Sequence, residues 1–336
     1  EKHLPMREDT IFRYSSLTKP LVAVTALKLV EQRVLSLDAP VTKYLPDFHP
    51  KLPDGSAPTI TIRHLLTHTG GLGYGFTEAA DGPYHRANVS DGLDSPGLSM
   101  EENLKRLGSV PLRSAPGKAF HYSLSLDVLG EILARSTGKS LPDLVADSVS
   151  RPLGLVDTEF RIRDQSRLAQ AYFNGPKEPE LMKEGTIVPL VGAGVVFSPS
   201  RILNAASYPS GGAGMAGTAS DYLTFLEAIR KQDSRLIHAD TYKALGENQL
   251  GTADHSELLG PGVGFGWISS VVVDPNLAKS PVNAGTMRWG GVYGHSWFID
   301  PKAGISMVLL TNTALEGMAG RLPQEIAAAI YSGGQN

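Results

Sequence analysis

A serine and a lysine three positions apart stand at the head of an apolar segment near the start of the sequence. Ser16 and Lys19 lie in the stretch YSSLTKPLVAVTALKLV, which covers residues 14–30. One helical turn separates them, so both side chains can point the same way. A serine hydroxyl is a poor nucleophile until a base takes its proton. Apolar surroundings and the positive end of a helix both lower the pKa of a lysine, so the pattern predicts a serine nucleophile served by a lysine base.

The same S-x-x-K spacing occurs again at Ser136 and Lys139. There it falls at the expected end of a helix, where Gly138 can act as the cap and the helix dipole has the wrong sign for a nucleophile. We interpret this second match as structural and the first as catalytic. For the first match, the alternative is a Lys19 that merely faces solvent from a core helix.

Several elements are expected to position these residues. A helix from about residue 17 to residue 32 is apolar on nearly every side, which predicts burial all round. Two more helices are expected, one capped by Ser123 or Ser125 and one capped by Ser220. The other expected elements are a strand at 10–14, strands at 265–273, 292–300 and 304–312 with a hairpin between the last two, and a helix at 322–331. This order predicts one α+β unit with a helical insertion.

Composition excludes several classes of function. The formal net charge is −3 and no dense run of lysine or arginine occurs, so there is no electrostatic reason to expect nucleic acid or an anionic membrane as partner. The longest apolar run, residues 21–27, is too short to span a bilayer. The sequence contains no cysteine, which excludes disulfides and thiolate chemistry. We expect a cytoplasmic protein, although the lack of cysteine does not determine the compartment.

Five stretches of the sequence occur in a recognisable order between Met6 and Met318. They read FRYSSLTKP, ITIRHLLTHTGGL, PGKAFHYSLSLDVLGEILARSTGKSL, RPLGLVDTEF and RWGGVYGHSWFIDP. With these boxes the sequence resembles the serine β-lactamase-like superfamily. Within it, the sequence is most similar to the family VIII carboxylesterases, relatives of class C β-lactamases and penicillin-binding proteins.

The resemblance implies a β-lactamase/transpeptidase-like α+β fold. An antiparallel sheet flanked by helices would adjoin a helical subdomain, with the active site between them. Residues 1–25 and 256–336 would form the sheet part and residues 26–255 the mostly helical part, together one catalytic unit. Family members place a helix and a β-hairpin before the segment that matches PMREDTIF. We therefore expect an open sheet edge, to be covered by a further N-terminal segment, a separate processed chain or a partner strand.

The resemblance also assigns roles at the site. Ser16 matches the nucleophile, Lys19 its partner base and Tyr122 the tyrosine of the second box. Tyr172, in AYFNG, fits the Y-x-N pattern better but follows a stretch that packs in these proteins, so we prefer Tyr122. A phenol beside a lysine ammonium has its anionic form favoured and could relay a proton to the leaving group. The two groups would titrate as a coupled pair, which leaves open which one is the base.

The third box of lactam-binding relatives, Lys-Thr-Gly, is absent. Its match is Trp289, Gly290 and Gly291, the form seen in family VIII esterases. The family uses the N–H of the nucleophile and an N–H just after this box as the oxyanion hole, which implies Ser16 and Val292 as donors.

Two departures from the lactamase pattern bear on the substrate. Leu124 stands where the lactamase box has an asparagine, and Trp289 replaces the cation that meets a substrate carboxylate. Both changes favour an uncharged small-molecule ester, and no cofactor is implied. The residues expected to bind it are Trp289, Gly290, Gly291, Leu124 and Tyr293. Three further aromatic residues could line the pocket or belong to the core: Tyr74, Phe76 and Trp297.

The histidines do not indicate a metal site or a Ser-His-Asp triad. His64 and His68 are four residues apart, but no glutamate lies between them and no third ligand is evident, so we expect no metal. His68-Thr69-Gly70 precedes the tyrosine box and so cannot replace Lys-Thr-Gly. No G-x-S-x-G motif occurs, and we assign His295 to packing near the site. The glycine-rich segment 208–218 lacks the G-K-[ST] of a phosphate loop and is interpreted as a turn before a helix.

The sequence predicts a serine hydrolase that cleaves short-chain carboxylic esters through an acyl-enzyme. Two other functions stay open. One is an amidase or peptidase acting on D-amino-acid amides, or a β-lactamase-like amide hydrolase, because the chemistry is shared. The other is a non-catalytic penicillin-binding-like scaffold. The sequence does not determine the oligomeric state.

Overall fold

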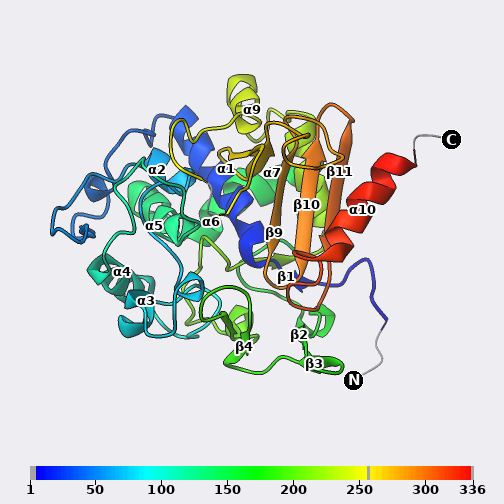
Figure 1. The fold of residues 1–336 in the computed structure, drawn as a ribbon, viewed down its shortest axis with the longest axis horizontal. Helices are drawn as coiled ribbons and strands as arrows, with labels where there is room; N and C mark the ends of the chain where they lie inside the picture. The colour runs from blue at the N-terminus through cyan, green and yellow to red at the C-terminus, as the bar shows by residue number, and fades with distance from the viewer. Residues whose placement is uncertain (1–4, 256–257, 334–336) are drawn as a thin grey trace.

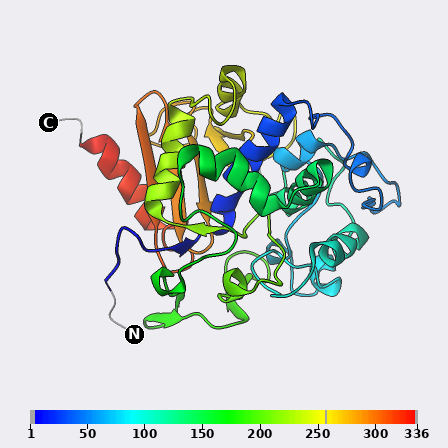
Figure 2. The ribbon, with the colours of Figure 1, turned by 180° about the vertical axis from the view of Figure 1, so that it is seen from behind.

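The computed structural model describes residues 5–255 and 258–333. The last part of the chain forms a five-stranded antiparallel sheet in the order β11-β10-β9-β8-β7. Its strands are β7 (Val263–Phe265), β8 (Ser270–Val272), β9 (Met287–Gly291), β10 (His295–Asp300) and β11 (Ile305–Leu310). Helix α10 (Arg321–Ser332) lies over one face of this sheet and α8 (Ala219–Arg230) over the other (Figures 1 and 2). The predicted pairing of the last two strands and the closing helix are confirmed.

Two strand predictions need correction. The segment predicted as one strand at 265–273 turns back on itself, because Gly266 N–H donates to Ser269 O at 2.8 Å and separates β7 from β8. The strand predicted at 292–300 begins only at His295, because the Trp-Gly-Gly box ends β9 and a turn separates β9 from β10. The first strand, β1 (Phe12–Arg13), pairs with β6 (Ala216–Gly217) and not with the five-stranded sheet.

The central helix α1 (Thr18–Glu31) follows a 3-10 turn at Ser15–Leu17 and runs between the sheet and the helical part of the molecule (Figure 1). Every residue from 14 to 27 is buried, which confirms the predicted burial on all sides. Leucine, valine and alanine side chains of α1 pack into the main core, with most of them fully inaccessible to solvent. Helix α1 therefore carries Ser16 and Lys19 into the middle of the protein.

The middle of the chain is loop-rich and mostly helical. Its α-helices are α2 (Ile62–Leu66), α3 (Pro83–Arg86), α4 (Met100–Ser109), α5 (Ser125–Thr137), α6 (Leu141–Val145), α7 (Arg151–Leu153) and α9 (Ala239–Leu245). A π-helical turn covers Ala146–Ser150, and 3-10 turns cover Val41–Lys43, Gly75–Thr77, Gln165–Arg167 and Arg201–Leu203. Two small hairpins are β2 (Tyr172–Asn174) with β3 (Pro179–Leu181) and β4 (Thr186–Val188) with β5 (Val195–Phe197).

Helix ends were predicted with mixed success. Gly138 ends α5 with a φ of 71°, the left-handed conformation expected of a glycine cap. The predicted N-caps are wrong. Leu124 occupies the N-cap of α5 without a side-chain bond, and Thr218 caps α8 by accepting a hydrogen bond from Asp221 N–H at 3.2 Å. Thr218 precedes the predicted Ser220 by two residues, an error typical of helix boundaries.

Strand β11 stands at the edge of the sheet, and all six of its residues are only half-buried. Among the residues that the structure describes, no strand pairs with its outer side. This agrees with the open edge expected from the sequence. What covers that edge stays a prediction, as does the division of the chain into residues 1–25 with 256–336 and residues 26–255.

The glycine-rich segment 210–214 crosses the first turns of α5 at close range. A Cβ added at Gly211 would overlap Leu126 O and lie 3.5 Å from Gly130 Cα. The backbones can approach this closely because Gly211 lacks a side chain. The next residue, Gly212, is therefore held at a fixed position beside α1 and α5.

We expect Gly211→Ala to lower the free energy of unfolding by about 1–3 kcal/mol, because the new methyl group overlaps a backbone atom that cannot move alone. Gly130→Ala is the matched control. Its Cβ would meet the tip of the Leu141 side chain, 2.7 Å away, which can shift, and alanine favours a helix by roughly 0.5–1 kcal/mol. Urea unfolding followed by circular dichroism measures both. Equal losses in the two variants would contradict this account of the crossing.

Candidate active site

The hydroxyl of Ser16 contacts both of its predicted partners. Tyr122 OH donates to Ser16 Oγ at 2.6 Å, and Lys19 Nζ donates to the same oxygen at 3.3 Å. Lys19 Nζ also donates to Gly212 O at 2.9 Å. Ser16 is 7% exposed and Lys19 only 4%. The structure thus brings Tyr122 and Gly212, both far away in the sequence, to the neighbouring Ser16 and Lys19, at a point that water barely reaches.

Aromatic rings surround the phenol of Tyr122. Trp289 Nε1–H donates to Tyr122 OH at 3.4 Å, and the two ring centroids lie 5.1 Å apart. The rings of His68 and Tyr74 lie 5.0 and 5.2 Å from that of Tyr122. Lys19 Nζ stands 4.6 Å from the Tyr122 ring centroid, a cation–π distance. These rings keep the Tyr122 hydroxyl turned toward Ser16 Oγ.

The end of β9 lies directly against the turn that carries the nucleophile. Ser15 has a φ of 46°, uncommon for a residue with a side chain. A Cβ at Gly291 would lie 2.6 Å from Ser15 Oγ and 2.7 Å from Tyr14 O, so only glycine allows this approach. Among the described residues, neither Ser16 N–H nor Val292 N–H donates a hydrogen bond within the protein. Two unpaired amides on these facing segments are what an oxyanion hole requires.

Comparisons with known proteins identify relatives of the whole chain. The model of the family described as Beta-lactamase matches residues 1–330. Esterase EstB of Burkholderia gladioli is 50% identical over 331 residues, which cover 98% of this chain and 84% of that protein. The solved structure of EstCE1, a hydrolase with promiscuous acyltransferase activity, has a TM-score of 0.93 at 44% identity, covering 97% of this chain and 86% of that one. Lovastatin esterase of Penicillium rubens is 25% identical, over 89% of this chain and 78% of that protein.

The chain belongs to the beta-lactamase family. The family and the β-lactamase/transpeptidase-like fold predicted from the sequence are thereby confirmed. None of the helices within residues 5–255 and 258–333 is long and apolar enough to cross a membrane.

The residues predicted to bind substrate in this beta-lactamase family member do not all lie beside Ser16. Trp289 does, through Tyr122. The Leu124 side chain is fully buried in the core, and its N–H donates to Gly73 O at 3.2 Å. Tyr293 packs edge-on against Phe197, with the ring centroids 4.8 Å apart. A Cβ at Gly290 would point toward Met318, on the other side of β9.

The two rival motifs lie elsewhere. Ser136 Oγ donates to Leu133 O at 3.1 Å, and Lys139 Nζ pairs with Asp147 at 2.9 Å on the surface. Ser136 and Lys139 therefore serve the end of α5. Tyr172 lies on β2, where its N–H donates to Asn312 O at 2.7 Å.

Each histidine singled out in the sequence has a structural partner. His64 forms a capping box with Thr61 at the start of α2. His295 Nε2–H donates to Arg13 O at 2.8 Å, and burial lowers the pKa of His295 to about 4. His68 is fully buried, its Nδ1 accepts a hydrogen bond from Ser123 N–H at 3.2 Å, and burial followed by the Lys19 charge lowers its pKa well below the usual value. The described residues contain no group of three potential metal ligands.

The sequence did not predict that Gly212 belongs to the site. The segment around it was interpreted as a turn before a helix, whereas its carbonyl receives the Lys19 ammonium. The run of glycines was the available signal, because paired glycines often mark a close approach of backbone to another group. Tyr74, for which pocket and core were both open, stacks on Phe76 with centroids 4.6 Å apart and lies 5.3 Å from Lys19 Nζ.

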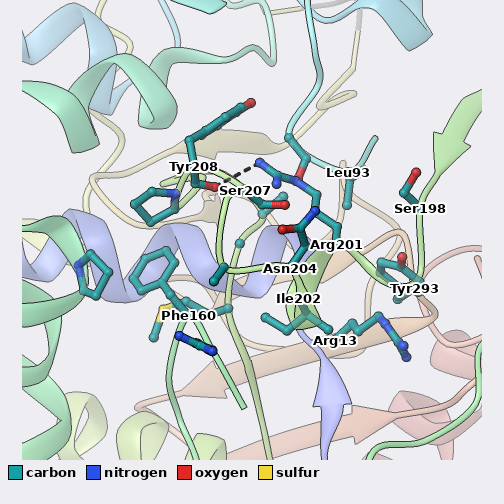
Figure 3. Close-up of a pocket in the computed structure, with 18 residues that line it drawn as sticks. Arg13, Leu93, Phe160, Ser198, Arg201, Ile202, Asn204, Ser207, Tyr208 and Tyr293 are labelled. Atoms are coloured by element: carbon teal, nitrogen blue, oxygen red, sulfur yellow. Dashed lines mark hydrogen bonds between the residues drawn. The ribbon is translucent and has the colours of Figure 1, made fainter. Parts of the chain in front are cut away.

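A cavity of about 210 Å³ lies beside this site, lined partly by residues 213–215 (Figure 3). Its buried arginine Arg201 donates to Gly92 O at 2.8 Å and to Tyr208 O at 3.0 Å. Arg13, also in the lining, donates to the backbone oxygens of Pro199 and Ala169, both at 2.8 Å. Backbone carbonyls thus occupy donors of both guanidinium groups, which brace the surrounding loops.

We expect Gly291→Ala to lower kcat for an activated ester by at least about tenfold, because the added methyl group would push β9 away from the Ser15–Ser16 turn and misplace the reacting groups. Gly108→Ala in α4 is the control, since its Cβ would be in ordinary contact with Phe48 at 3.5 Å. Steady-state kinetics and circular dichroism on both variants check this. A folded Gly291→Ala protein with unchanged kcat would contradict the proposed fit.

Proposed function

We propose that this beta-lactamase family member hydrolyses short-chain carboxylic esters through an acyl-enzyme on Ser16. The observation that carries the proposal is the pair of hydrogen bonds from Tyr122 and Lys19 to one serine oxygen. A serine held in this way by two groups able to exchange protons has a route for losing its proton as it attacks.

In the first half of the reaction, Ser16 Oγ attacks the ester carbonyl carbon and its proton passes to the Lys19–Tyr122 pair. The carbonyl oxygen becomes an oxyanion, which the N–H groups of Ser16 and Val292 stabilise, each by roughly 10²–10³ in rate. When the tetrahedral intermediate collapses, the C–O bond to the alcohol breaks and the pair protonates the departing oxygen.

In the second half, a water molecule attacks the acyl-enzyme carbonyl while the Lys19–Tyr122 pair removes its proton. Collapse breaks the bond to Ser16 Oγ, the proton returns to the serine, and the carboxylic acid leaves. Because Tyr122 and Lys19 both touch Ser16 Oγ, the pair acts as one unit and the proton belongs to the pair.

The relatives bear out the predicted class of enzyme, a carboxylesterase. EstB is an esterase at 50% identity over nearly the whole chain, and EstCE1 is a hydrolase with the same fold. The substrate is accordingly a small-molecule ester. Short acyl chains, the cytoplasmic location and the roles of the individual residues remain our predictions.

Two features support esters over lactams and other amides. The side chain at position 124 is an apolar leucine in the core, so it offers no hydrogen bond to a substrate amide. Trp289 presents an indole where lactam-binding relatives present a cation, and its N–H is directed to Tyr122 OH. An anionic substrate would find neither of its usual partners here. The non-catalytic scaffold is disfavoured because Ser16, Lys19 and Tyr122 are hydrogen-bonded to one another.

Ser16→Ala should lower ester turnover by at least about 10⁴-fold, because the nucleophile is gone and groups that act as a unit fail together. Lys19→Ala should lose nearly as much, and the double variant should be little worse than Ser16→Ala alone. Ser136→Ala, in the second S-x-x-K match, is the control and should keep full activity. Hydrolysis of p-nitrophenyl butyrate measures all four. Activity retained in Ser16→Ala and lost in Ser136→Ala would refute the assignment.

The wild-type protein should hydrolyse p-nitrophenyl acetate and butyrate readily and open benzylpenicillin slowly or not at all, because Leu124 and Trp289 remove the recognition of an anionic amide. The ratio of the two kcat/KM values is the measurement, and the same alcohol or amine can be compared as ester and amide to separate an esterase from an amidase. Efficient penicillin hydrolysis would show that these two positions do not set the specificity.

A further inference from the structure

A buried carboxylate lies next to the residue that receives the Lys19 ammonium. Asp127, in the first turn of α5, is only 2% exposed. Ser210 Oγ donates to its Oδ1 at 2.5 Å. Its Oδ2 is buried and has no hydrogen-bond partner among the described residues. A carboxylate in such a place is costly unless other charges compensate it.

Gly212 connects this carboxylate with Lys19. Its carbonyl accepts the hydrogen bond from Lys19 Nζ at 2.9 Å. A Cβ added at Gly212 would overlap Asp127 Oδ2, and it would lie 3.0 Å from Tyr74 OH. Asp127 and Lys19 thus contact the same glycine. This explains why the glycine-rich segment, which the ester chemistry alone does not require, runs between α1 and α5.

We propose that Asp127 is the counter-charge of the Lys19–Tyr122 pair, a positioning residue that stabilises the positive charge the pair gains when it takes the proton of Ser16. It acts across Gly212 and does not touch the substrate. This inference rests on the function proposed above and identifies what stabilises, in a buried site, the charge that the pair gains on accepting the proton.

The other groups that face Asp127 do not replace Lys19 as its titrating partner. Arg201, from the 3-10 turn at 201–203, is always charged and contributes a constant field. Burial raises the pKa of Tyr74 and of Tyr208 well above the usual value, so both phenols stay neutral. Burial, followed by the charge of Asp94, raises the pKa of Asp91 to about 8, so this second carboxyl is mostly protonated at neutral pH.

The charge state of Asp127 itself follows from opposing effects. Burial has the largest effect and raises its pKa above the usual value, while the Ser210 hydroxyl, the charges of Lys19 and Arg201 and the backbone N–H of Gly212 oppose it. Each of these four neighbours favours the anion. A protonated Lys19 and an ionised Asp127 therefore stabilise each other, and removing either charge weakens the other.

Loss of the Asp127 charge should change the pH dependence of catalysis in the same direction whether Lys19 or Tyr122 is the base. Without the Asp127 charge, the protonated form of the pair is less stable, whether the proton leaves Lys19 or Tyr122. The pair then loses its proton at lower pH. The acidic limb of the kcat/KM profile should move to lower pH by about one unit, the size typical of a nearby opposite charge. At the pH optimum kcat should fall by about tenfold, because one pKa unit corresponds to a tenfold change in equilibrium.

The test compares pH profiles of kcat/KM for p-nitrophenyl butyrate in the wild type, Asp127→Asn and Asp91→Asn. The control removes a half-buried carboxyl that instead accepts hydrogen bonds from Gly75 N–H and Phe76 N–H, at 2.9 and 3.1 Å. We expect the acidic limb to move only in Asp127→Asn, with KM for this neutral ester unchanged. An unmoved limb in a folded Asp127→Asn protein, or an equal movement in Asp91→Asn, would overturn the proposal.

Ser210→Ala tests the same point if Asp127→Asn does not fold. Without the Ser210 hydrogen bond the pKa of Asp127 rises, so a smaller fraction of this carboxyl is ionised and the limb should move in the same direction by a smaller amount. An unmoved limb in this variant would also overturn the proposal. Failure of the ester reaction itself would appear separately, as a wild-type protein without turnover. An active wild type with unmoved variants would overturn only the role of Asp127.

Discussion

The site depends on placing a lysine ammonium where almost no water can solvate it. Lys19 is 4% exposed, so its donors must find acceptors inside the protein. Two of them are Gly212 O, at 2.9 Å, and Ser16 Oγ, at 3.3 Å. The apolar helix α1 that buries Lys19 also excludes other acceptors. The nucleophile is thus one of the few oxygens that the lysine can reach.

Segments remote in sequence meet at this point because glycines let their backbones approach. Gly211 lies against Leu126 O, Gly212 against Asp127, and Gly291 against Ser15. These contacts position three groups of the site: the carbonyl that accepts from Lys19, the buried carboxylate, and the amide after β9. A methyl group at any of these glycines would move the two contacting segments apart and misplace the reacting groups.

The reacting residues could be predicted from the sequence because their order and spacing are local features. Ser16 and Lys19 lie within one turn, and Tyr122 directly precedes a strongly patterned helix. The acceptor role of Gly212 and the position of Asp127 could not be predicted, since both depend on how segment 210–214 crosses α5. The predicted boundaries of the strand at 265–273 were wrong because they too depend on contacts that the sequence does not display. Only backbone hydrogen bonds, such as Gly266 N–H to Ser269 O, show that this apolar run folds back on itself.

The same architecture has a consequence for how the protein acquires activity as it folds. Ser16, Tyr122, Gly212 and Val292 are separated by roughly a hundred residues each, so the site closes only after several long loops have closed, and long-range contacts of this kind form slowly. Recovery of catalysis during refolding should therefore require all of these contacts, including that of β9 with the 3-10 turn before α1. Activity is in this sense a probe of complete folding, more stringent than helix content.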